Sequence, residues 1–66
     1  MDDARREARL RVQRAPGDAI GWILLAEAEL DAGDALAGEH AALRALTLQP
    51  DHPEALARLG RAQSMQ

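Results

Sequence analysis

Few side chains in this sequence are of the types that carry out catalysis. The chain has no cysteine, and Ser64 and Thr47 are its only serine and threonine, so nucleophiles are almost absent. His40 follows Glu39, and His52 lies in a turn, but neither histidine has a second base or metal ligand in phase with it. No glycine-rich phosphate loop, H-E-x-x-H or G-x-S-x-G motif is present. The sequence therefore predicts a protein that is not an enzyme and holds no metal or cofactor.

Two runs of charged residues suggest binding rather than catalysis. The basic run lies near the N-terminus and comprises Arg5, Arg6, Arg9, Arg11 and Arg14. A net charge of −3 and the presence of only one aromatic residue, a tryptophan, for base stacking argue against a nucleic-acid interface. We therefore interpret this run as a solvated helix face or a contact between subunits. The acidic run comprises Glu27, Glu29 and Asp31, and alternate residues on a helix do not converge on one point. We expect the acidic run to face solvent.

The chain is small and its apolar residues are mostly small. Of 66 residues 47% are hydrophobic, but 15 of them are alanine, which leaves few large side chains for a core. Chains of this size rarely stabilise a core without staples, and disulfides are excluded. Stability must come from well-formed helices and from a partner, either a second copy or the rest of a longer protein. Because no apolar stretch reaches the length of a membrane span or a signal sequence, the sequence predicts a soluble, cytoplasmic protein.

Breakers divide the chain into four segments of helical length. Pro16-Gly17-Asp18, Gly33-Asp34 and Pro50-Asp51-His52-Pro53 interrupt the helical periodicity. We expect an all-α fold with helices over residues 3–14, 19–32, 35–48 and from residue 53 onward. Asp18 and Asp34 are suited to cap the second and third helices, Gly33 is suited to end the second, and Pro53 occupies a first helical position.

The positions of these segments resemble the tetratricopeptide repeat (TPR), a helix–turn–helix unit of about 34 residues. The separation of Pro16 from Pro50 equals this period, and we call it the repeat spacing. The resemblance implies one full repeat over residues 19–52, flanked by helix B of a preceding half repeat (1–18) and helix A of a following one (53–66). It implies a single domain in which antiparallel helices form a right-handed stack. The residues that occupy the family's structural positions are Trp22, Leu25, Ala26, Gly33, Gly38, Ala45, Pro50, Leu56, Leu59 and Gly60.

Gly38 supports this assignment on physical grounds. A glycine inside a helix costs about 0.8–1 kcal/mol relative to alanine, a loss that makes sense where another backbone approaches closely. We expect Gly38 to meet Ala26 on the preceding helix, with Trp22 and Leu25 filling the space beside them. The chain departs from the family pattern at Glu29, where tyrosine is usual, and at Ala42, where a bulky aromatic residue is common.

The TPR resemblance implies a concave groove, lined by the helix-A faces, that binds a protein or peptide. The matching positions are Ile20, Ile23, Glu27, Leu30, Asp31, Glu54, Ala57 and Arg61. For Ile20, Ile23 and Leu30 the competing interpretation is burial against the preceding helix. Only Arg61 is basic among these positions, which argues against the family's carboxylate-clamp ligands.

The first functional hypothesis is a non-enzymatic TPR module for protein–protein contact. Similar alanine- and leucine-rich TPR stretches precede catalytic domains in larger bacterial proteins, so this chain is expected to be the N-terminal part of a multidomain protein. The alternative is a self-associating homodimer in which a two-fold contact covers the apolar residues Leu10, Leu56, Leu59 and Met65. An RNA-associated helical adaptor is the third and weakest hypothesis.

Overall fold

Four helices make up the described part of the chain, as the breakers predict. The computed structural model describes residues 3–66, and their helices are α1 (Asp3–Arg14), α2 (Ala19–Asp31), α3 (Ala35–Leu48) and α4 (Pro53–Met65). These described residues form no strand, which confirms the all-α prediction. The only shift from the expected bounds is at the end of α2, which stops one residue before Ala32.

The turns between helices use the capping residues that the sequence predicts. Asp18 accepts a hydrogen bond from the backbone N–H of Ile20 at 3.0 Å, and Asp34 accepts one from Ala37 at 3.0 Å. Gly33 has a φ of +87°, the left-handed conformation that ends a helix with little cost only at glycine. His52 caps α4, because its Nδ1 accepts from the N–H of Glu54 at 3.3 Å.

The helix bounds recur at the repeat spacing that separates Pro16 from Pro50. Helix α4 begins and ends one repeat spacing after α2, and α3 ends one repeat spacing after α1. The side chains that cap α2 and α4, Asp18 and His52, keep the same spacing and each accept from the N–H two residues ahead. The helix bounds and the capping positions therefore recur at one spacing along the described chain.

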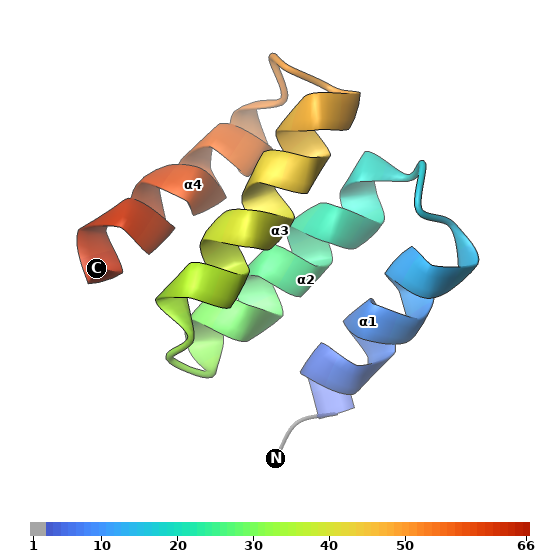
Figure 1. The fold of residues 1–66 in the computed structure, drawn as a ribbon, viewed down its shortest axis with the longest axis horizontal. Coiled ribbons are helices and arrows are strands. Elements are labelled where there is room, and N and C mark those ends of the chain that lie inside the picture. The colour runs from blue at the N-terminus through green and yellow to red at the C-terminus, as the bar shows by residue number, and fades with distance from the viewer. Residues whose placement is uncertain (1–2) are drawn as a thin grey trace.

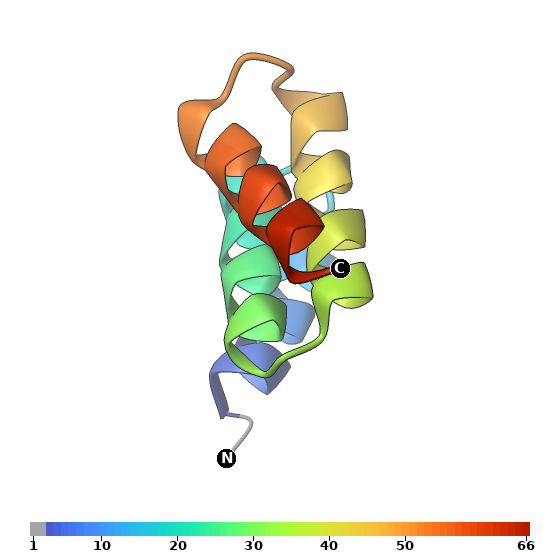
Figure 2. The same ribbon diagram turned by 90° about the vertical axis from the view of Figure 1, so that its left-hand side faces the viewer.

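Helix α2 lies at the centre of the arrangement. It packs against α1, α3 and α4. Among the described helices, α1 packs mainly against α2. Figure 1 shows α1 and α4 at the two edges of the molecule. The molecule is thin, with extents of 30 × 29 × 14 Å, and Figure 2 shows it from its narrow side. Helix α2 thus contacts each of the other described helices, while α4 packs mainly against α3.

Small side chains allow the helices to lie close together. One buried cluster joins the first three helices through Ala8, Val12, Leu25, Ala26, Ala41 and Ala42. A second joins α2, α3 and α4 through Ala19, Ile23, Ala45 and Ala55. Trp22 packs against both clusters and supplies much of the volume that alanine lacks.

The predicted close approach at Gly38 is confirmed. A Cβ atom added there would lie 3.4 Å from the carbonyl oxygen of Ala26 and 2.6 Å from Cγ of Leu30. Leu30 is fully buried, so its side chain has little room to move away. Gly38 is therefore required by the packing of α3 on α2.

Substituting alanine for each of two helical glycines tests this contact. Gly38→Ala adds a methyl group against Leu30, and we expect a loss of about 1–3 kcal/mol in the free energy of unfolding. Gly60 is also inside a helix, but nothing lies within 4 Å of the position of its Cβ. Gly60→Ala should therefore stabilise the protein by about 0.5–1 kcal/mol. Urea unfolding of both variants checks the opposite signs; equal effects would show that α3 does not pack closely here.

Candidate functional site

The carboxylate of Glu29 on α2 is buried and paired with two arginines of α1. Glu29 is 4% exposed. Its Oε1 lies 3.3 Å from Nη1 of Arg5, and its Oε2 accepts a hydrogen bond from Nη2 of Arg9 at 3.1 Å. The prediction that the whole acidic run faces solvent is therefore wrong at Glu29. An ionised carboxylate tolerates burial only when it is paired in this way.

The other two acids of the run face α4. Nη2 of Arg58 lies 3.5 Å from Oε2 of Glu27, and Nη2 of Arg61 lies 2.9 Å from Oδ1 of Asp31. Both Asp31 and Arg61 have exposed side chains, so this pair adds little stability. Together with Glu29, these acids link α2 to a helix on either side.

Three of the five arginines in the basic run form ion pairs within the molecule. Arg5 and Arg9 pair with Glu29, and Arg11 pairs with Asp18 at 3.3 Å. The remaining arginines of the run, Arg6 and Arg14, are exposed. A phosphate backbone would have to compete with these carboxylates for most of the basic charge.

Trp22 fixes the loop that precedes α2. Its indole Nε1 donates a hydrogen bond to the carbonyl oxygen of Pro16 at 2.9 Å. The guanidinium of Arg44 on α3 lies 5.2 Å from the centroid of the tryptophan ring, within the range of a cation–π contact. The loop and α3 are thereby held to the same side chain, and Trp22 has a structural role.

A groove runs between α1 and α2. Its volume is about 370 Å³, and Leu24 and three alanines provide its apolar lining. The residues that line it are Ala4, Glu7, Ala8 and Arg11 from α1 and Leu24, Glu27, Ala28 and Asp31 from α2. Of the groove positions expected from the TPR resemblance, Glu27 and Asp31 contribute to it.

The other expected groove residues are distributed differently. Ile23 and Leu30 are each 2% exposed and belong to the core, so their assignment to a partner surface is wrong. Helix α2 is apolar nearly all round in its first half, and this hides which of its residues face outward. Ile20 is 42% exposed, and Glu54, Ala57 and Arg61 lie exposed on α4, outside this groove.

At the repeat spacing, the residues that line this groove correspond to residues of α3 and α4, between which α2 packs. The buried residues of α3 are Gly38, Ala41, Ala42 and Ala45. The α1 residues that line the groove lie one repeat spacing before these four, and its α2 residues lie one repeat spacing before Arg58, Arg61, Ala62 and Met65 on α4. Helix α2 itself packs against both α3 and α4. The residues that line the open groove thus lie one repeat spacing before residues of the two helices, α3 and α4, against which α2 packs.

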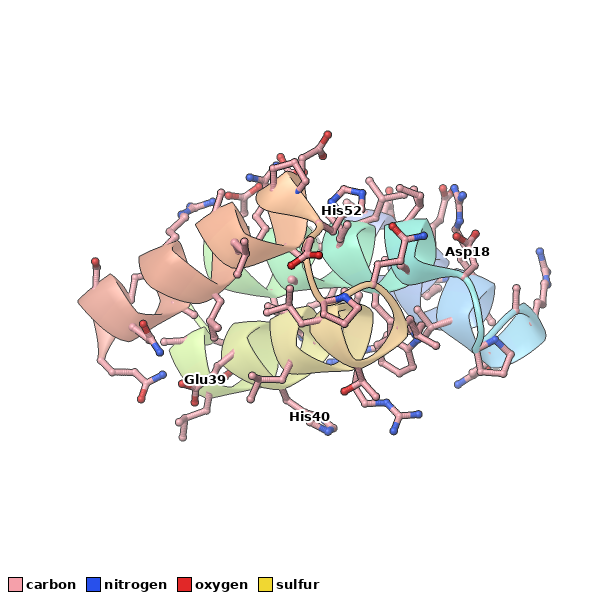
Figure 3. The ribbon with its side chains drawn as sticks, turned by 90° about the horizontal axis from the view of Figure 1, so that it is seen from above. Asp18, Glu39, His40 and His52 are labelled. Atoms are coloured by element: carbon pink, nitrogen blue, oxygen red, sulfur yellow. The ribbon has the colours of Figure 1, made fainter. Side chains whose placement is uncertain are left out.

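The side chains that might support catalysis stay apart. Figure 3 shows Glu39 and His40 on one side of the molecule and His52 on the other. Within residues 3–66, no group of three or more histidine, aspartate or glutamate side chains is placed to hold a metal ion. None of the helices in this range is long and apolar enough to cross a membrane.

Comparison with protein-family models, with curated proteins and with solved structures gives no match for this chain.

Neutralising Glu29 tests the buried ion pairs. Glu29→Gln keeps the shape of the side chain but leaves Arg5 and Arg9 facing an amide, so we expect about 1–3 kcal/mol less stability. Asp31→Asn is the matched control, because its exposed pair should change stability by no more than about 0.5 kcal/mol. Thermal and urea unfolding compare the two. If Glu29→Gln unfolds at the same temperature and urea concentration as the wild type, the carboxylate does not hold α1 onto α2.

Proposed function

We propose that this chain is a non-enzymatic protein-interaction module of the TPR type, whose α1–α2 groove binds a helical segment of a partner protein. The observation that carries the proposal is the correspondence between this groove and the space filled by α2. A surface with the same lining positions one repeat earlier offers a place for a helix of similar width.

The spacing of the helices supports the TPR assignment. Helices α2 and α4 have the same length and are separated by the repeat spacing, which is the period of this repeat family. Gly38 and Ala26 lie where the two helices of the full repeat meet, which agrees with the small residues usual there. Repeats of this kind cannot bury their apolar faces alone, so an open face at either end can be buried by binding another helix.

The composition of the groove favours a helix over a small molecule. Ala4, Ala8 and Ala28 leave room for the backbone of a partner helix to approach, as Ala41 and Ala42 do for α2. Leu24 is 40% exposed beside them and offers an apolar contact. Acidic side chains provide polar groups at the rim. This pattern of anchors and rim is typical of helix-in-groove recognition.

Filling the groove tests this function. We expect a displayed library of helical peptides to yield sequences that bind the immobilised protein, with an affinity that falls about tenfold or more (about 1.4 kcal/mol) in Ala4→Trp. Ala57→Trp is the matched control, since Ala57 is an exposed alanine on α4 outside the groove. Failure to enrich any peptide, or loss of binding in Ala57→Trp alone, would contradict the proposal.

A further inference from the structure

Helix α4 carries a face that no other described helix covers. Leu56 is 49% exposed, and Gly60 has open space where a Cβ atom would lie. The residues one repeat spacing earlier, Trp22 and Ala26, are packed in the core against α3 and its neighbours. On α2 these positions are half-buried at Trp22 and fully buried at Ala26, whereas on α4 both are exposed.

The uncovered face and the open groove are complementary halves of one contact. In the chain, α2 places Leu25 and Ala26 against the small residues of α3. The matching residues of α4 are Leu59, which is half-buried against the core of its own chain, and Gly60, which is exposed. The groove offers two alanines of α1, at positions 4 and 8, which lie one repeat spacing before Gly38 and Ala42. Helix α4 thus has the residues that the groove requires of its occupant.

We propose that α4 of one molecule binds in the α1–α2 groove of a second copy of this chain. This inference rests on the proposed function, because it names the helix that the groove holds. The incoming α4 takes the place relative to α1 and α2 that α2 takes relative to α3 and α4. Each contact between two copies would then repeat the packing of α2 on α3 and α4 that exists within one chain.

The bounds of the described helices match this arrangement. Helix α4 is as long as α2, so it fits a space shaped for α2. Within the chain, α2 ends at Asp31 and α3 begins at Ala35. On the same spacing, α4 ends at the position matching Asp31, and the described part of α1 begins at the position matching Ala37. The two copies therefore meet end to end in the helical order of a single chain.

The charges around the groove are largely paired within the molecule. Glu27 and Asp31 face Arg58 and Arg61 of the same chain's α4, and Arg11 pairs with Asp18. The exposed residues of the uncovered face, Leu56, Gly60 and Gln63, carry no charge. An incoming α4 therefore adds no unpaired charge to the contact through this face.

This contact is heterologous, because two different surfaces meet. Each copy keeps a free groove beside α1 and a free face on α4. Figure 1 shows these two helices at opposite edges of the molecule. Association therefore adds further copies and does not close as a two-fold pair. A two-fold dimer through α4 alone would leave the groove empty. A substitution in the groove would then have no effect on the dimer, whereas it would block the contact proposed here.

Two variants that each block one side of the contact test the inference. Ala4→Arg fills the groove and leaves α4 intact, while Leu56→Asp places a carboxylate on the uncovered face and leaves the groove intact. Both positions are exposed, so both variants should fold, which circular dichroism verifies. Sedimentation equilibrium is measured from micromolar to millimolar concentration for the wild type, each variant and an equimolar mixture.

We expect the mean mass of the wild type to rise beyond that of a dimer as concentration increases. Each variant alone should stay monomeric, and the mixture should form one-to-one dimers, since only one intact groove and one intact α4 remain in each pair. A wild type that is monomeric throughout would overturn the inference, as would a dimer that Leu56→Asp alone abolishes and mixing does not restore. A monomer that still selects helical peptides through the groove would leave the proposed function standing.

Discussion

The close packing of α3 on α2 is the constraint on which the rest of the structure depends. Helix α1 packs on α2, and α4 packs mainly on α3, so the distance between α2 and α3 sets how far apart the two outer helices lie. That distance is short because Gly38 has no side chain where Leu30 and the backbone of Ala26 lie. The cost of a glycine inside a helix is offset by the complete burial of Leu30 and Ala26.

Ion pairs then orient the outer helices around α2. Glu29 draws two arginines from α1, while Glu27 and Asp31 face two arginines from α4. The paired carboxylate of Glu29 joins α1 to α2 where the two helices are in contact. Because this carboxylate is buried, breaking its pairs costs more than breaking the exposed pairs on the other side.

Local signals in the sequence predict the helices well, because caps and breakers act over a few residues. Asp18, Gly33 and Asp34 define helix ends through their own hydrogen bonds or backbone angles. The burial of Glu29 could not be predicted in this way, since the arginines that pair with it belong to another helix, far away in the sequence. For Leu30 the sequence leaves burial and a partner surface as alternatives for a related reason: the burial depends on Gly38 of a neighbouring helix.

The groove is proposed to bind its partner in the way α2 packs against α3, so the α2–α3 contact is the most direct one to measure. In a nuclear Overhauser experiment on the protein in solution, the account predicts strong cross-peaks between the α protons of Gly38 and the methyl groups of Leu30. It also predicts that these signals persist at concentrations where the protein is monomeric. Absence of these cross-peaks while both helices remain formed would contradict the account.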